Sequence, residues 1–175
     1  MKTKKDRRPP IAPYLDEPPP RGLFTRLARV ALHTARLQEE SMRAIDLRFS
    51  DYTVLATLRK EGVEEGLPVS RLAELVLRPM GSFTQVIDRL ARLDLVRRLT
   101  APNDRRMVLI AITDEGERVA LHGASVYDRI HSRVLEGLDP KHLDQIDRGV
   151  RLLLEALEED MQKDEATREV EESGD

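Results

Sequence analysis

Residues 69–116 decide the fold, and they read VSRLAELVLRPMGSFTQVIDRLARLDLVRRLTAPNDRRMVLIAITDEG. This stretch predicts two short helices followed by a hairpin. Pro79 separates the helices, because proline disfavours helical geometry at the residue before it. Two runs of branched residues, Val96 to Thr100 and Met107 to Ile112, then flank a polar, turn-forming linker. Helix, turn, helix and basic hairpin together indicate a winged helix-turn-helix.

The second helix of this pair carries an apolar stripe at three- and four-residue spacing, while its other side is polar. The stripe comprises Phe83, Val86, Ile87, Leu90 and Leu93. The helix is expected to begin at Pro79, or with Ser82 as its N-cap and Gln85 as the capping-box partner. Asp94 occupies the position where a helix-ending glycine is usual, and aspartate tolerates the left-handed conformation better than most residues.

Longer amphipathic helices are predicted on both sides of this stretch, the first from Leu23 to about Ala44. The predicted N-caps along the chain are Ser50, Ser70, Thr113 and Asp139. The apolar faces of the three flanking helices are too long for so small a central domain to cover. We therefore expect a symmetric dimer built from them. The fold class is mainly α with a small β-wing.

The chain divides into five predicted segments. They are a basic, proline-rich extension expected to be disordered (1–21), an N-terminal dimerisation helix (22–48), the winged helix-turn-helix (49–113), C-terminal dimerisation helices (114–162) and an acidic tail (163–175). Six of the ten prolines lie in the extension, which prevents a regular helix there. The helix is expected to fray after Asp160.

Composition narrows the class of protein. A chain of 175 residues suffices for one ordinary domain. The absence of cysteine excludes disulfides and thiolate metal sites, and no apolar run approaches the roughly 20 residues that span a bilayer. A soluble cytoplasmic protein is expected.

The charge is unevenly distributed along the chain. The net charge is −3, but residues 71–106 hold eight arginines against four acids, whereas residues 155–175 carry a net charge of −8. The basic middle segment suits a nucleic-acid partner.

Two surfaces are candidates for contacting DNA. The polar side of the second short helix has side chains that can read base edges in a major groove: Ser82, Thr84, Gln85, Arg89 and Arg92. An ordinary solvated helix face is the alternative, with Asp88 supporting Arg92 one turn on. The hairpin tip places Asp104, Arg105 and Arg106 after Asn103, and arginines on a protruding ribbon suit a minor groove. A charged tip that blocks edge aggregation is the alternative.

The stretch from Ser50 to Gly116 resembles the MarR (multiple antibiotic resistance regulator) family. The residues that carry the resemblance are VSRLAELV, FTQVIDRLARLDLVRR and DRRMVLIAITDEG. It implies a homodimeric regulator, usually a repressor, on a pseudopalindromic double-stranded DNA operator. By the same resemblance Arg106 enters the minor groove with Asp104 as its orienting partner, and Thr84, Gln85 and Arg89 face the major groove and phosphates. The string RPMGSFTQVIDRL is similar to the urate- and phenolate-responsive branch, although this chain has no tryptophan.

Members of that family bind small, often aromatic, anions between the dimer helices and the DNA-binding lobe. The candidate effector contacts here are His33, Tyr52 and Arg118, whose alternatives are a satisfied polar group, a core residue and an exposed charge. The four histidines lack metal-ligand spacing, so neither a metal nor a cofactor is expected. No nucleophile–base pair or glycine-rich phosphate loop is present, which argues against an enzyme. A winged-helix interaction module that has lost specific DNA binding is the alternative function.

Overall fold

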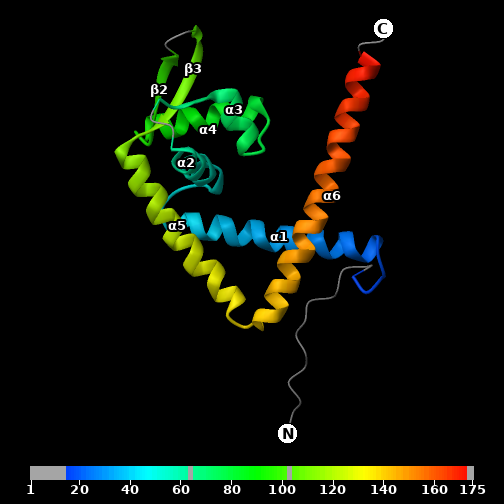
Figure 1. Cartoon of the computed structure of the whole chain (residues 1–175). Helices are drawn as coiled ribbons and strands as arrows, with labels where there is room; N and C mark the ends of the chain where they lie inside the picture. The colour runs from blue at the N-terminus through cyan, green and yellow to red at the C-terminus, as the bar shows by residue number, and fades with distance from the viewer. Residues whose placement is uncertain (1–14, 63–64, 102–103, 173–175) are drawn as a thin grey trace. The chain divides into compact units, whose positions relative to one another are not determined.

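The computed structural model describes residues 15–62, 65–101 and 104–172 (Figure 1). In chain order the elements are α1 (Arg21–Arg43), α2 (Phe49–Glu61), β1 (Leu67–Pro68), α3 (Val69–Leu75), α4 (Met80–Arg92), β2 (Val96–Ala101), β3 (Asp104–Ile112), α5 (Asp114–Leu135) and α6 (Pro140–Glu172). The predicted class, mainly helical with a small β-wing, is confirmed. The chain forms two compact units, one ending at His131 and the other beginning at Ser132. Most of the N-terminal extension, residues 1–14, lies outside the described residues.

The sheet is a three-stranded antiparallel unit in the order β1–β3–β2. Leu67 of β1 and Arg98 of β2 both lie opposite Ile110 of the central strand. The pairing shifts between Thr100 and Ala101, a bulge of the kind that bends and twists a ribbon near its end. Figure 1 shows the β2–β3 ribbon projecting beyond α3 and α4. Both strands are longer than the predicted runs, since pairing extends to the edge of the turn.

The core of the first unit forms where α2, α3 and α4 meet the sheet. Its members are apolar side chains that solvent barely reaches: Val54, Leu55, Leu58, Leu72, Phe83, Val86, Ile87, Leu90 and Ile110. The predicted stripe of α4 is therefore confirmed at four positions. At Leu93 it is wrong, because the helix ends at Arg92 and the Leu93 side chain is 49% exposed.

The start of α2 differs from the prediction. Arg48 is the N-cap, and its backbone N–H donates to the Asp51 Oδ2 at 3.1 Å. Ser50 lies inside the first turn, so the predicted Ser50 cap is wrong. The carboxylate three residues into the helix supplies the stabilising bond, and it also places negative charge near the positive end of the helix dipole.

The short helices α3 and α4 begin after prolines. α3 starts at Val69, one residue before the predicted cap Ser70, and its N-cap is Pro68. α4 starts at Met80 with Pro79 as the N-cap, in an extended conformation. Both predictions for this end were wrong, since the Ser82 hydroxyl donates to the carbonyl of Pro79 at 3.2 Å rather than capping. Proline fixes its own φ, and here that geometry sets the helix start.

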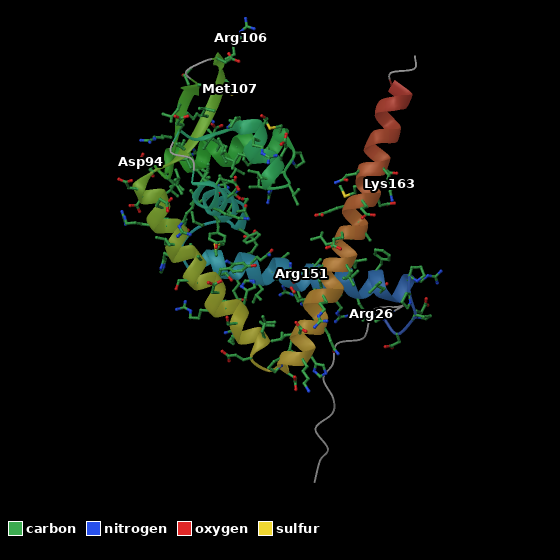
Figure 2. The ribbon with its side chains drawn as sticks, in the orientation of Figure 1. Arg26, Asp94, Arg106, Met107, Arg151 and Lys163 are labelled. Carbon is green, nitrogen blue, oxygen red and sulfur yellow. The ribbon has the colours of Figure 1, made fainter. Side chains whose placement is uncertain are left out.

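The junction between the ribbon and α5 is closely packed. The Thr113 Oγ1 accepts the Gly116 N–H at 3.0 Å and donates to the Asp94 carbonyl at 2.7 Å, so the predicted Thr113 cap is confirmed. A Cβ on Gly116 would lie 2.1 Å from the carbonyl oxygen of Leu95. Only glycine allows α5 to start this close to the base of the ribbon, beside Asp94 in Figure 2.

Helix α6 is longer than expected. Its predicted cap is confirmed, because the Lys141 N–H bonds to the Asp139 carboxylate at 2.8 Å. The expectation of fraying after Asp160 is wrong, since the helix runs to Glu172. Residues 150–172 contain neither glycine nor proline and consist mostly of good helix formers. Ion pairs one turn apart, such as Arg151 with Asp147 at 2.8 Å, add to this preference.

Candidate DNA-binding surface

Helix α4 has one buried face and one exposed polar face. Ser82, Thr84, Gln85, Asp88 and Arg92 are all exposed on it, opposite the buried Phe83. An α-helix with its side chains is about 10–12 Å across, which suits a major groove about 12 Å wide. The outer face offers hydroxyl, amide and guanidinium groups of the kinds that can pair with base edges.

Arg89 does not lie on that exposed face, so the expectation of exposure is wrong. Its Nε is 3.0 Å from both carboxylate oxygens of Asp51, and its Nη2 contacts Asp51 Oδ1 and lies 3.4 Å from the Ser50 hydroxyl. The Asp51 side chain is 2% exposed and that of Arg89 is 21% exposed. The pair anchors α4 to the start of α2. Sequence reasoning missed Asp51, because nothing in the local pattern pairs residues 38 positions apart.

A second charge pair connects α4 with the ribbon. Arg98 on β2 donates from Nη2 to the Asp88 Oδ1 at 2.6 Å. The predicted partnership of Asp88 with the Arg92 side chain is therefore corrected; the Arg92 Nε reaches only the Asp88 carbonyl oxygen, at 3.4 Å. The partner of the Asp88 carboxylate therefore comes from β2 and not from the residue one helical turn away. The pair ties the orientation of the ribbon to that of the helix.

The ribbon ends in a basic tip. Arg106 is exposed, and Figure 2 shows it at the outer end of the ribbon. Asp104 Oδ1 accepts the Arg106 backbone N–H at 2.9 Å, so it holds the backbone of the arginine rather than its guanidinium. Asn103 and the side chain of Arg105 lie outside the part of the chain that the structure describes.

The lobe has uncompensated positive charge at its surface. Arg71 pairs with Glu74 at 3.1 Å, and Arg98 pairs with Asp88. Among the residues that the structure describes, the exposed arginines without a salt bridge in this region are Arg78, Arg92, Arg97 and Arg106. Arg78 and Arg92 lie at the two ends of α4 and suit a phosphate backbone, whereas Arg97 lies on the other side of the ribbon beside Thr113 and Glu117.

The three candidate effector contacts lie on three different helices, α1, α2 and α5. His33 is exposed on α1, and Arg118 is exposed on α5, where it pairs with Glu115. Tyr52 is half-buried against Tyr127, with ring centroids 5.9 Å apart. No interaction joins His33, Tyr52 and Arg118 within residues 15–62, 65–101 and 104–172.

Tyr52 belongs to an aromatic group that sequence reasoning did not assemble. Its ring lies 6.2 Å from that of Phe49, and Tyr127 stacks on His131 at 3.7 Å. A Cβ on Gly123 would approach the Tyr52 ring to 2.7 Å, so the glycine makes room for it. Burial, reinforced by the nearby Asp128 carboxylate, raises the pKa of Tyr52 above its usual value. The hydroxyl therefore stays neutral across the physiological range.

Within the described part of the chain, His, Asp and Glu form no group of three that could hold a metal ion. The helices described there include none that is both long and apolar enough to cross a membrane.

Comparisons with known proteins agree with this geometry. No protein-family model matches the chain. The HTH-type transcriptional regulator PecS of Dickeya dadantii (strain 3937) is 30% identical over 145 residues, which cover 75% of this chain and 87% of that protein. CouR from Rhodococcus jostii RHA1, solved bound to p-coumaroyl-CoA, is 25% identical with a TM-score of 0.65, covering 82% of this chain and 95% of that one. A mutant of MarR from E. coli, solved in complex with operator DNA, is 22% identical with a TM-score of 0.66, covering 75% and 94%.

A winged-helix lobe with an exposed polar recognition helix and a basic ribbon defines a DNA-binding transcriptional regulator, and its relatives are regulators rather than enzymes. The chain belongs to the MarR family of winged helix-turn-helix transcriptional regulators.

Proposed function

We propose that the protein binds a pseudopalindromic operator as a homodimer and represses transcription from it. Each subunit places α4 in the major groove and the ribbon tip in the adjacent minor groove. The single observation that carries the proposal is the exposed polar face of α4 beside the unpaired arginines. We assign base or phosphate contacts to Ser82, Thr84, Gln85, Arg92 and, at the ribbon tip, Asp104, Arg105 and Arg106.

Arg89 has a different role in this proposal. Its guanidinium donates to the Asp51 carboxylate. Arg89 therefore acts as a positioning residue that fixes the orientation of α4 against α2. The Asp88–Arg98 pair acts similarly between α4 and the ribbon. Major- and minor-groove contacts must be made together, and these two pairs therefore set the distance between them.

The dimer is supported by large apolar side chains that are exposed on α1 and on α6. On α1 they include Phe24, Val30 and Leu32. On α6, Ile146, Val150, Leu154, Leu157 and Met161 recur at three- and four-residue steps and form one row. A row of this kind is the usual sign of a helix-to-helix interface. We assign residues 22–48 and 114–162 to dimerisation, residues 49–113 to DNA binding, residues 1–21 to an N-terminal extension and residues 163–175 to an acidic tail. A repressor of this kind works in the cytoplasm, beside the chromosome.

A small aromatic acid is the proposed effector class. CouR, one of the similar structures, was solved with p-coumaroyl-CoA. In this chain Tyr52 is the effector candidate that lies among other aromatic rings, while His33 and Arg118 are exposed charges or donors on neighbouring helices. Binding of such an anion would favour a dimer whose recognition helices no longer match successive major grooves, about 34 Å apart.

The test is a fluorescence-anisotropy titration of the full chain against DNA from its own upstream region, with scrambled DNA as the control, at two salt concentrations. We expect tighter binding to the native DNA and an affinity that falls steeply with salt. Arg106→Ala should weaken operator binding about tenfold, while the matched Lys141→Ala on α6 leaves it unchanged. Full affinity of Arg106→Ala would remove the ribbon from the proposed interface.

The alternative is an interaction module that has lost specific DNA binding. The net charge of −3 and the acidic residues at the end of α6 favour it. Absence of binding to either DNA at low salt would select this alternative, because the exposed arginines would then serve another partner. Equal binding to both DNAs would instead mean an operator elsewhere or an architectural role.

A further inference from the structure

The turn between α3 and α4 exposes a leucine in an unfavourable backbone conformation. Leu77 has φ +52°, in the left-handed region, and its side chain is 90% exposed. Among the described residues with an exposed large apolar side chain, Leu77 is the most exposed. Residues with a Cβ avoid this conformation, and an exposed leucine gains nothing from burial to offset it.

Two other helix ends show how the chain normally makes this turn. After α1 and after α4 the left-handed residue is an aspartate, Asp46 or Asp94, with φ of 55° and 56°. The next residue in each case is a buried leucine, Leu47 or Leu95, whose N–H bonds back to the helix at 3.1 and 3.0 Å. The polar residue faces water and the leucine packs beneath, which is the usual form of this helix-ending motif.

The end of α3 has the same pattern of backbone hydrogen bonds, but the order of residue types is reversed. The apolar residue comes first and the polar residue second. The Leu77 N–H bonds to the Glu74 carbonyl at 3.0 Å, and the Arg78 N–H bonds to the Ala73 carbonyl at 2.9 Å. Here Leu77 occupies the exposed left-handed position. Arg78 occupies the next position, which is a buried leucine at the ends of α1 and α4. Since folding alone is better served by the order found at α1 and α4, the exchange points to a role for Leu77 outside the folded chain.

The location of Leu77 indicates what it meets. The turn leads directly into α4, whose first residue, Met80, is also exposed. In a helix-turn-helix the N-terminal residues of the second helix approach base edges in the major groove. The apolar group in that groove is the C5-methyl of thymine. Arg78, exposed between the two apolar side chains, suits a flanking phosphate.

We propose that Leu77, together with Met80, contacts thymine methyl groups of the operator and so determines part of its sequence. This inference rests on the proposed function, because it requires α4 in the major groove. It adds an apolar form of recognition to the hydrogen-bond donors on the outer face of α4. The predicted operator has thymine at one or two positions of each half-site that Gln85 and Arg92 do not read.

The experiment first uses the full-length protein to select a duplex from a random-sequence DNA pool. Each thymine of that duplex is then replaced singly by deoxyuridine, which removes only the methyl group. For the unmodified protein we expect affinity to fall about fourfold at one or two positions per half-site. Because Leu77→Asn removes the contact from both subunits, it should bind the thymine duplex about sixteenfold more weakly and show no further loss on deoxyuridine at the position that Leu77 contacts.

Two controls separate recognition from folding. Asparagine is comfortable in the left-handed conformation, so Leu77→Asn should melt at or above the temperature of the unmodified protein. Leu93→Asn changes an exposed leucine at the other end of α4 and should keep the full sensitivity to deoxyuridine. Met80→Gln should reduce the sensitivity at the second position, where one is found, and leave the position that Leu77 contacts unchanged.

Several results would overturn the proposal. Selection of no duplex would overturn it together with the proposed function. A selected duplex with equal deoxyuridine losses for the unmodified protein and Leu77→Asn would overturn the methyl contact alone, leaving the operator-binding function intact. Normal DNA binding by Leu77→Asn combined with lost regulation in cells would also overturn it, because the turn would then contact a protein.

Discussion

Several leucine side chains are buried in the winged-helix lobe, whereas several on helix α6 are exposed. In the lobe, Leu55, Leu72 and Leu90 are completely buried, whereas Leu154 and Leu157 of α6 are 51% and 40% exposed. The lobe has enough elements around its sheet to enclose its apolar side chains within one chain. Helix α6 has a comparable row that the other residues of its own unit do not enclose. The difference shows that the lobe encloses its own core, and it is the reason we propose that α6 packs against a second subunit.

The largest expected effect comes from opening the lobe. Phe83→Ala removes a fully buried ring from α4 and should lower the free energy of unfolding by about 3–5 kcal/mol. Urea denaturation followed by circular dichroism measures this loss. Met107→Ala, at an exposed position of β3, should change it by less than about 0.5 kcal/mol. Equal losses for the two variants would mean that the lobe is not closed around Phe83.

The next effect tests the buried charge pair of the lobe. Asp51→Ala leaves the Arg89 guanidinium without its carboxylate and removes the bond that caps α2. Breaking a buried pair costs about 3–5 kcal/mol, but Arg89 keeps some access to water, so we expect about 2–3 kcal/mol in urea denaturation. Operator affinity should fall as well. Asp88→Ala, which breaks the exposed pair with Arg98, should cost less than about 1 kcal/mol of stability.

The third effect should appear in assembly and not in the lobe. Leu157→Glu places a charge in the apolar row of α6 and should weaken dimerisation by about 2 kcal/mol, or about thirtyfold. Sedimentation velocity over a range of concentrations measures the change. Gln162→Glu adds the same charge outside the row and is the matched control. An unchanged dimer in Leu157→Glu would show that the exposed row is not the interface.

The smallest effect concerns Tyr52 at high pH. Its pKa is raised by burial, so the folded protein favours the neutral phenol. The stability that depends on the neutral form is fully present below pH 10, the ordinary value, and is lost as the pH rises through the raised pKa. Above pH 10 the unfolding free energy should therefore fall more steeply than in Tyr52→Phe, with equal slopes near pH 8. Urea titrations at both pH values test this, and identical slopes throughout would contradict the burial of Tyr52.

Much of the fold follows from local signals. The spacing of Phe83, Val86 and Leu90 predicts α4, and the branched runs predict the ribbon. The first residues of the helices were harder to predict from the sequence. Ser50, Ser70 and Ser82 are all good N-caps by residue type, yet the N-caps are residues that precede them in the chain. The candidate surface divides similarly. The exposed positions Thr84 and Gln85 follow from periodicity, because a helix face is a local property.

The sequence by itself determined the class of this protein: a winged helix-turn-helix with a basic recognition segment and amphipathic helices around it. Tertiary structure alone decided which arginines are free. Arg89 and Arg92 are equivalent by type and spacing, but Arg89 meets the Asp51 carboxylate of α2 and Arg92 does not. The tertiary structure also decided which leucine is buried where a helix ends. Leu77, after α3, faces water, whereas Leu95, after α4, is buried. Periodicity is set by bonds along one element, whereas pairing depends on which distant elements fold against it.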